Sequence, residues 1–354
     1  MKALVLSGGE GTRLRPFTYS MPKQLMPVGN KPVLQYVLED IVALGVVEIG
    51  VIVGTWGSVI SDVIGDGSQF GARITYLRQT RPLGLAHCVS VAHSFLGDDD
   101  FVMYLGDNFL PDGMGDIADE FRADCADAHV VVRKVPDPRS FGVVELSEHG
   151  HVLRLVEKPR QPRSDLALIG VYFFTAAIHE AVDAIEPSAR GELEITDAIQ
   201  WLVANRRTVK ASEYGGFWKD AGRVEDVLEC NRHTLSGMTA CVAGLVDEAS
   251  ELSGRVVVER GARVIRSRID GPVIIGAHTV IEDSQVGPNT SIGRDCVLRA
   301  TRLADSILLD GASIADVSTL YGSMVGRGAT VSSTAIGTRH RIVVGDHARI
   351  DIAA

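Results

Sequence analysis

The chain of 354 residues is long enough for two or three domains, and 45% hydrophobic with 23% charged residues is typical of a globular protein. A formal net charge of −10 argues against general nucleic-acid binding, which depends on an excess of Lys and Arg. No apolar run approaches the roughly 20 residues that a membrane-spanning helix needs, so no membrane contact is expected. The five cysteines are scattered, which predicts reduced thiols in a cytoplasmic protein rather than a zinc site or a disulfide framework.

The first part of the chain alternates predicted strands with predicted helices. Buried strands are indicated by apolar runs at 3–6, 48–53 and 101–105. Apolar residues at helical spacing predict helices at 33–44 and 86–95. Such alternation predicts a parallel sheet covered on both faces, in which ligands bind at the carboxyl ends of the strands.

The next part of the chain has fewer helices between its strands. Strands are predicted at 130–132, 143–146, 152–156 and 171–174. We expect these strands to form an antiparallel insertion that could cover a substrate. Helical spacing returns at 195–203 and 224–235.

After about Gly237 the hydrophobic period changes. Apolar residues recur every five or six positions, often before a glycine or another small residue, at Val258, Val264, Ile269, Ile275, Ile281, Val286, Ile292, Val297, Leu303, Ile314, Leu320, Val325, Val331, Ile336 and Ile342. This is the hexapeptide pattern of a parallel β-helix, in which three steps make one coil of about 17 residues. A β-sandwich would instead show period-2 strands with turns every 8–12 residues or so. We expect the apolar residues to point inward, so that successive coils stack into a solenoid.

A cluster of glycines follows the first predicted strand, at Gly8, Gly9 and Gly11. Glycines at such a place let the backbone approach a phosphate chain closely and offer its N–H groups as donors. The pattern is neither a P-loop nor a dinucleotide fingerprint, because no Gly-Lys-Ser/Thr follows and Leu14 stands where a third Gly belongs. Cations crowd the same segment, at Arg13, Arg15 and Lys23, and they suit a triphosphate.

Two aspartates stand at predicted strand ends. Asp107 ends the strand at 101–105, and Asp220 precedes the helix at 224–235. Such carboxylates could hold Mg²⁺, which takes one or two carboxylates plus phosphate oxygens, or they could cap turns and helices. Glu157 and Lys158 follow another strand, although a pair of this kind is often only a surface ion pair.

Together these segments resemble the sugar-phosphate nucleotidyltransferases, and within them the glucose-1-phosphate thymidylyltransferases. The resemblance covers about residues 1–235 and includes, in order, GGEGTRLRPFT, PKQLMPV, NKPVLQYVLE, QTRPLGLA, LGDN, FGVVE, VEKP, RGELEITD and FWKDAG. Leu83 and Lys219 depart from the usual pattern without removing a candidate ligand. The resemblance implies an α/β fold with a Rossmann-like nucleotidyltransferase domain and mixed sheet at 1–237, followed by a left-handed parallel β-helix at 238–354.

The same resemblance implies a role for each matching residue. Gly8, Gly9 and Gly11 would line the nucleotide, and Gln79 and Gly84 would read the base edge. Arg13 would hold the β- and γ-phosphates and Lys23 the α-phosphate, while Asp107 and Asp220 would hold Mg²⁺. The sugar hydroxyls would contact Gly142, Glu157 and Gly170, and the sugar phosphate would contact Lys158 and Arg190.

The implied reaction joins dTTP and glucose 1-phosphate to give dTDP-glucose and pyrophosphate. Its nucleophile is a phosphate oxygen that is already anionic, so no general base is expected, and the task is to bring two anions together in line. A mannose-1-phosphate guanylyltransferase is the main alternative. A bifunctional acetyl-transferring enzyme and a non-catalytic regulatory subunit are weaker alternatives. The β-helix is expected to carry no chemistry and to support a homo-oligomer.

Overall fold

The computed structural model describes residues 1–333 and 339–353, and the chain divides into two compact units. The first unit comprises Met1–Gly9 and Leu34–Asp220, and the second comprises Glu10–Val33 and Ala221–Ala354. The segment Glu10–Val33, called the N-terminal loop below, is therefore grouped with the C-terminal part of the chain. Within the described residues, no helix combines the length and apolar character needed to cross a membrane.

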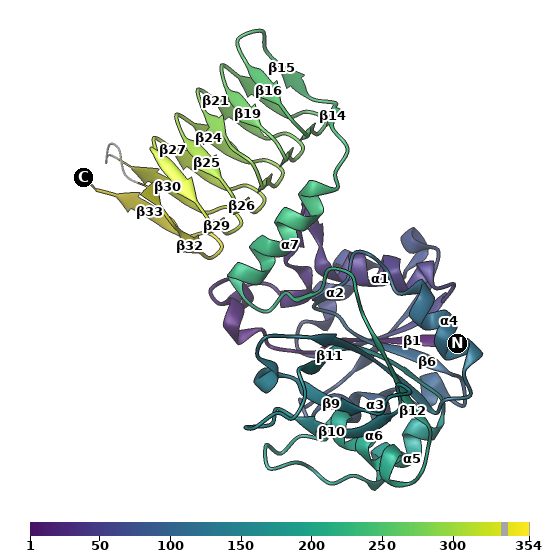
Figure 1. Ribbon diagram of the computed structural model, residues 1–354. Coiled ribbons are helices and arrows are strands. Elements are labelled where there is room, and N and C mark those ends of the chain that lie inside the picture. The colour runs from purple at the N-terminus through teal and green to yellow at the C-terminus, as the bar shows by residue number, and fades with distance from the viewer. Residues whose placement is uncertain (334–338, 354) are drawn as a thin grey trace. The chain divides into compact units, whose positions relative to one another are not determined.

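A mixed sheet forms the centre of the first unit (Figure 1). Its main path runs β10-β9-β11-β6-β1-β4-β5, with β8 paired to β11 and β12 paired to β8. The strands are β1 (Lys2–Ser7), β4 (Glu48–Val53), β5 (Arg73–Arg78), β6 (Phe101–Leu105), β8 (Ala128–Lys134), β9 (Gly142–Leu146), β10 (Val152–Glu157), β11 (Leu166–Phe174) and β12 (Val209–Glu213).

Parallel and antiparallel strands meet in this one sheet. Strands β6, β1, β4 and β5 are parallel neighbours, whereas β11 is antiparallel to β6, β8 and β9. The antiparallel pairing expected for the strands from 130 to 174 is thus confirmed, and these strands extend the central sheet. Two further strands, β5 and β12, were not predicted from the sequence, because β5 has only a short run between two arginines and β12 has no apolar run at all.

Helices cover both faces of the sheet, as the strand–helix alternation predicts. They are α1 (Val33–Ala43), α2 (Gly57–Ile64), α3 (Leu85–Leu96), α4 (Gly115–Ala123), α5 (Ala177–Ala184) and α6 (Ile195–Ala204). Neighbouring side chains of β11 point to opposite faces. Phe174 joins the core beneath α3, α5 and α6, whereas Phe173 stacks on Phe121 of α4 with ring centroids 5.4 Å apart.

Three parallel sheets build the C-terminal part of the second unit, consistent with the left-handed β-helix that the repeat predicts (Figure 1). The first face consists of β14 (Cys241–Val242), β17 (Val256–Val258), β20 (Val273–Ile275), β23 (Thr290–Ile292), β26 (Ile307–Leu308), β29 (Met324–Val325) and β32 (Val343–Val344). The second consists of β15 (Leu245–Val246), β18 (Arg263–Ile265), β21 (Val280–Glu282), β24 (Val297–Arg299), β27 (Ser313–Ala315), β30 (Thr330–Ser333) and β33 (Arg349–Ile352). The third consists of β16 (Glu251–Ser253), β19 (Arg268–Asp270), β22 (Gln285–Val286), β25 (Arg302–Ala304), β28 (Thr319–Tyr321) and β31 (Arg339–His340).

Most of the predicted inward residues form the core of this β-helix, but Val297 and Ile342 are only partly buried, and Val344 is the buried residue of strand β32. Val258, Ile275 and Ile292 stack in successive coils of the first face and are fully buried. On the second face, the middle residue of each three-residue strand points inward, so Leu298 is buried and the predicted Val297 is only partly buried. The predicted residue Ile336 lies outside the described residues.

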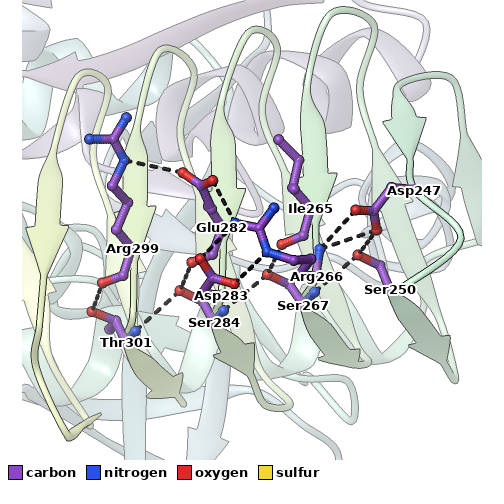
Figure 2. Close-up of polar contacts among 10 residues, drawn as sticks. All are labelled: Asp247, Ser250, Ile265, Arg266, Ser267, Glu282, Asp283, Ser284, Arg299 and Thr301. Carbon is purple, nitrogen blue, oxygen red and sulfur yellow. Dashed lines mark hydrogen bonds and ion pairs between the residues drawn. The ribbon is translucent and has the colours of Figure 1, made fainter.

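One corner of the β-helix carries a ladder of hydroxyl groups, drawn in Figure 2. The backbone N–H groups of Ser267, Ser284 and Thr301 donate to the hydroxyls of Ser250, Ser267 and Ser284, at 3.0, 3.0 and 3.2 Å. The Ser267 and Ser284 hydroxyls donate in turn to the carbonyls of Ile265 and Glu282. Each buried corner N–H therefore has an acceptor supplied by the preceding coil, which satisfies backbone groups that the sheets leave unpaired.

Candidate active site

The carboxyl ends of three adjacent parallel strands meet at one edge of the central sheet. Strand β1 lies between β4 and β6, with Ser7 opposite Val53 and Leu6 opposite Leu105. Gly8 and Gly9 follow β1, while Gly106 and Asp107 follow β6, and the Gly106 N–H donates to the Leu6 carbonyl at 2.9 Å. The predicted glycines and the predicted carboxylate therefore lie at neighbouring strand ends, where ligands bind in sheets of this kind.

Gln79 reaches this edge from the end of β5. A side chain added at Gly8 would place its Cβ 3.3 Å from the Gln79 Oε1, so Gln79 lies beside the first glycine of the cluster. The Gln79 Nε2 donates to the Gly84 carbonyl at 3.3 Å and lies 3.0 Å from the Nδ1 of His87. Burial, followed by the charge of Arg81, lowers the pKa of His87, which favours the neutral ring that can accept this bond.

Gly84 is the N-cap that precedes helix α3, and its backbone conformation suits glycine. Its φ is 106°, and an added Cβ would lie 2.3 Å from the Leu193 carbonyl oxygen. The Leu83 carbonyl accepts from the Leu193 N–H, and the Ala86 N–H donates to the Leu193 carbonyl. The two residues predicted to read a base, Gln79 and Gly84, are thus bonded to one another in the first unit.

Asp107 and Asp220 are brought to neighbouring positions by two very short strands. β7 (Asn108–Phe109) pairs antiparallel with β13 (Lys219–Asp220), and this register sets Asp220 directly opposite Asn108. Asp107 is the next residue before Asn108 and is 7% exposed. Residues opposite one another in such a ladder have Cα atoms about 4.5–5.5 Å apart. The chain therefore gathers two carboxylates that are more than a hundred positions apart in the sequence.

Asn108 is a residue of this edge that the sequence reasoning missed. It is 4% exposed, and its Oδ1 accepts from the Trp218 Nε1 at 2.8 Å, which adds a second link between β7 and the segment before β13. Gly170 of β11 has a φ of 81°, and an added Cβ would lie 2.5 Å from the Asn108 Nδ2. The glycine thus lets a strand of the sheet approach the residue beside Asp107. A buried Asn directly after a strand-end Asp was the available signal.

Most of the residues predicted to bind the sugar and its phosphate lie around Glu157, whereas Gly170 lies beside Asn108. Gly142 of β9 is paired with Glu157 of β10, and an added Cβ on Gly142 would lie 3.3 Å from the Glu157 Oε2. The Thr196 hydroxyl donates to the same Oε2 at 3.2 Å. The Lys158 Nζ lies 3.0 Å from the Glu157 Oε1, so the pair predicted from the sequence forms an ion pair.

Arg190 also reaches this group. Its guanidinium lies 3.8 Å from the Glu157 carboxylate and 3.2 Å from that of Glu194, and it also pairs with Glu192. Burial raises the pKa of Glu194, whose Oε1 accepts from the Ser188 hydroxyl at 2.8 Å. Lys158 and Arg190, both predicted to hold the sugar phosphate, thus share the Glu157 carboxylate in the first unit.

The other predicted cations lie in the N-terminal loop of the second unit. Arg13 is in the turn η1 (Thr12–Leu14) and is exposed, while Lys23 begins the turn η3 (Lys23–Leu25). The Thr18 hydroxyl donates to the Gly11 carbonyl at 2.8 Å, and an added Cβ on Gly11 would lie 3.0 Å from the Lys23 Cβ. The loop thus folds back on itself, so that Lys23 adjoins the last glycine of the cluster.

The family model described as "Nucleotidyl transferase" matches residues 2–237, and a model described as "GMPPB C-terminal domain" matches residues 269–352. The chain belongs to the nucleotidyl transferase family. The glucose-1-phosphate thymidylyltransferase of Streptomyces griseus is 53% identical to this nucleotidyl transferase, over 100% of both chains. A protein of the same name from Streptomyces antibioticus is 52% identical over 99% of each chain.

A solved structure from Bacillus anthracis, described as a glucose-1-phosphate thymidylyltransferase in complex with sucrose, is also similar to this nucleotidyl transferase. The two chains are 32% identical, with a TM-score of 0.61. The match covers 65% of this chain and 94% of that chain. That relative therefore matches over nearly its whole length while leaving about a third of this chain unmatched.

Nucleotidyl transferases of this family generally use a divalent metal ion. Among the described residues, no group of three or more His, Cys, Asp or Glu side chains is placed to hold a metal. Mg²⁺ needs only one or two carboxylates when substrate phosphates and water supply its other ligands. The neighbouring Asp107 and Asp220 match that requirement in number and chemistry.

Proposed function

We propose that this nucleotidyl transferase joins dTTP to glucose 1-phosphate and releases pyrophosphate, giving dTDP-glucose. The observation that carries the proposal is the similarity to two glucose-1-phosphate thymidylyltransferases along the whole chain, β-helix included. Within the first unit, the strand-end glycines and carboxylates and the cations around Glu157 are groups that suit this chemistry. The synthesis of rhamnose or of another deoxysugar would use this product.

The reaction proceeds by in-line attack of one phosphate on another. A phosphate oxygen of glucose 1-phosphate forms a bond to the α-phosphorus of dTTP. The bond between that phosphorus and the oxygen that bridges the α- and β-phosphates breaks. The electron pair leaves with pyrophosphate, so no proton transfer is needed. The catalytic task is to hold two polyanions in line and to offset their repulsion, which is achieved by positioning and by fixed charge.

In this proposal each predicted residue keeps its role toward the nucleotide. Gly8, Gly9 and Gly11 bring bare backbone against the triphosphate, and Gln79 and Gly84 contact the edge of the base. Arg13 holds the β- and γ-phosphates, and Lys23 holds the α-phosphate. Asp107 and Asp220 would hold Mg²⁺, which supplies positive charge to the phosphate oxygens when it is bound.

The sugar phosphate is proposed to bind at the group around Glu157. The carboxylate accepts hydrogen bonds from sugar hydroxyls, while Gly142 and Gly170 leave room for the ring. Lys158 and Arg190 now share the Glu157 carboxylate, and a bound phosphate gives both cations a dianionic partner. Binding therefore exchanges one set of ion pairs for another, which limits the cost of desolvating the two cations.

Three further assignments belong to the proposal. We take residues 1–237 as the nucleotidyltransferase domain and 238–354 as the β-helix domain. The enzyme is proposed to be a homo-oligomer and to act in the cytoplasm. All five cysteines are free thiols, which suits a reducing compartment.

Initial rates of pyrophosphate release test the proposed function. Purified enzyme with Mg²⁺ is assayed with dTTP, UTP, GTP and ATP, each against glucose 1-phosphate and mannose 1-phosphate. We expect the highest kcat/KM for dTTP with glucose 1-phosphate. A higher value for GTP with mannose 1-phosphate would make the chain a guanylyltransferase, and no release with dTTP and glucose 1-phosphate would overturn the proposed function.

A further inference from the structure

The N-terminal loop, which carries Arg13 and Lys23, is bonded to the β-helix and to helix α7 (Val224–Ser236) within the second unit. Two small strands of the loop, β2 (Pro27–Val28) and β3 (Lys31–Pro32), pair with each other, and β2 packs against α7. Helix α7 also packs against β23 of the β-helix. The loop is therefore fixed by the part of the chain that lies outside the central sheet.

Asn231 of α7 is the centre of this attachment. Its side chain is fully buried, and its Oδ1 accepts from the Gly29 N–H at 2.9 Å and from the Ser291 hydroxyl at 2.6 Å. Its Nδ2 donates to the Asn289 carbonyl at 3.2 Å. One buried amide therefore connects the loop, the helix and a coil of the β-helix, and each of its groups has a partner.

The N-terminal loop contacts the β-helix directly at two positions along the β-helix axis. The Asn30 Nδ2 donates to the Ile292 carbonyl at 2.7 Å, at the end of β23. The Ser20 hydroxyl donates to the Asp346 carboxylate at 2.8 Å, and an added Cβ on Gly345 would lie 3.1 Å from the Pro16 Cβ. Strands β23 and β32 are three steps apart in the strand order of the first face, so the contacts span about 14 Å along the β-helix.

Lys23 lies between these two attachment points along the chain, after Pro16 and before Gly29. Helix α7 itself is held independently of the loop, because Arg232 makes two bonds to the Asp305 carboxylate at 2.6 and 2.8 Å. Loss of a loop contact therefore leaves α7 attached to the β-helix. The loop's contacts can be tested without detaching the rest of the second unit.

We propose that the β-helix positions the N-terminal loop for catalysis, with Asn30 and Asn231 as positioning residues that act through Lys23. This inference rests on the proposed role of Lys23 at the α-phosphate. The sequence predicts a β-helix without chemistry of its own, and the inference assigns it an indirect part in the reaction. A displacement of about 1 Å at a group that orients a reacting phosphate costs roughly 100-fold in rate, so a loosened loop lowers kcat.

Asn30→Gly is the primary test, in the full-length enzyme. Asn30 has a φ of 62°, so glycine keeps the backbone conformation and removes only the side-chain bond to the β-helix. Asp316→Gly is the matched control, because Asp316 has a φ of 58° and lies exposed on the β-helix. We expect N30G to lower kcat at least about tenfold while the KM for glucose 1-phosphate changes less than about twofold, and D316G to match wild type.

The double variant N30G/K23A separates positioning from general destabilisation. If Asn30 acts through Lys23, the double variant is no slower than K23A alone, because the residue that the contact positions is already absent. If N30G lowers kcat by the same factor in the wild-type enzyme and in K23A, the proposal is overturned. Gly345→Ala supplies a second test should N30G fold poorly, since it presses on Pro16 instead of removing a bond, and Gly237→Ala is its control.

Failure of the inference is distinct from failure of the proposed function. Wild-type kcat in both N30G and G345A, together with a large loss in K23A, would leave the function intact and exclude the positioning role. Wild-type kcat in K23A would instead remove the proposed role of Lys23. Thermal melting of each variant by circular dichroism shows whether it is folded before the rates are compared.

Discussion

At the scale of single residues, the acidic pair is the part of the site most dependent on the fold. Asp107 follows a long apolar strand, and its place at the sheet edge could be predicted because the run ends there. Asp220 reaches it only because β13 pairs with β7, and these two-residue strands have no sequence pattern of their own. The sequence suggested each carboxylate separately, whereas the register β7–β13 is a finding of the structure.

Asp107→Asn and Asp220→Asn test this pair. Each variant keeps the size of the side chain and removes one negative charge from the proposed Mg²⁺ site. We expect each to lower turnover at least about 100-fold, which is typical when a key electrostatic contact at a reacting phosphate is lost. Turnover is measured over a range of Mg²⁺ concentrations, and rates near wild type at saturating Mg²⁺ would remove the aspartate from the site.

Lys158→Ala and Lys23→Ala test the division of substrates between the two lysines. Lys158 pairs with Glu157 in the group around the sugar strands, whereas Lys23 adjoins Gly11 in the N-terminal loop. We expect K158A mainly to raise the KM for glucose 1-phosphate and K23A mainly to lower kcat, because only Lys23 is proposed to contact the α-phosphate at which bonds form and break. Steady-state kinetics with both substrates varied would reveal the opposite pattern if the roles are exchanged.

At the scale of elements, long periodic segments could be predicted and short ones could not. The helix expected at 224–235 is α7, and the strands expected at 48–53 and 101–105 have the predicted bounds. Asn231 lies on the apolar face of α7, at helical spacing from Val224, Val227 and Leu228. A polar residue on such a face indicates that its side chain is buried and hydrogen-bonded. Its partners were not predictable, because they are a loop N–H, a hydroxyl and a carbonyl.

The hydroxyl ladder of the β-helix was also absent from the sequence-based expectations. The sequence predicts small residues at the corners, and the structure adds that Ser284 accepts from the Thr301 N–H while donating to the Glu282 carbonyl. We expect Ser284→Ala to lower the free energy of unfolding by about 1–3 kcal/mol, because a buried N–H loses its acceptor. Denaturant unfolding followed by circular dichroism measures the loss, with Ser313→Ala in strand β27 as the control. An equal effect of both variants would contradict the prediction.

At the scale of the whole molecule, the two units do not divide the chain at one point in the sequence. The segment Glu10–Val33 is grouped with the C-terminal part, although it carries residues proposed to bind the nucleotide. The buried apolar residues of the loop do not reveal from the sequence which part of the chain they pack against. The contacts that attach the loop to the β-helix include polar bonds from Ser20 and Asn30 and the close approach of Pro16 to Gly345. The β-helix itself could be predicted because its repeat extends over many coils.

Removal of the β-helix tests what it contributes to the whole enzyme. A chain of residues 1–237 keeps every predicted site residue and helix α7, but exposes Asn231 and Arg232, which are bonded to the β-helix in the full chain. We expect this chain to lose stability or assembly, because the β-helix faces are proposed to support the oligomer. Light scattering and pyrophosphate release are the measurements, and a folded chain with unchanged assembly would exclude the supporting role.

The corner ladder has a consequence for how the length of this protein can change. Each coil adds one rung, so an insertion or deletion preserves the ladder only when it removes or adds a whole coil. Deleting residues 267–283 would join Arg266, whose φ of 43° is close to the 48° of Asp283, directly to Ser284. A coil between β23 and β32 cannot be removed in this way without loss of a contact, because the N-terminal loop contacts both ends of that stretch. A variant that lacks one coil before Asn289 should therefore melt cooperatively and stay active. A variant that lacks one coil after Asn289 should have a lower kcat.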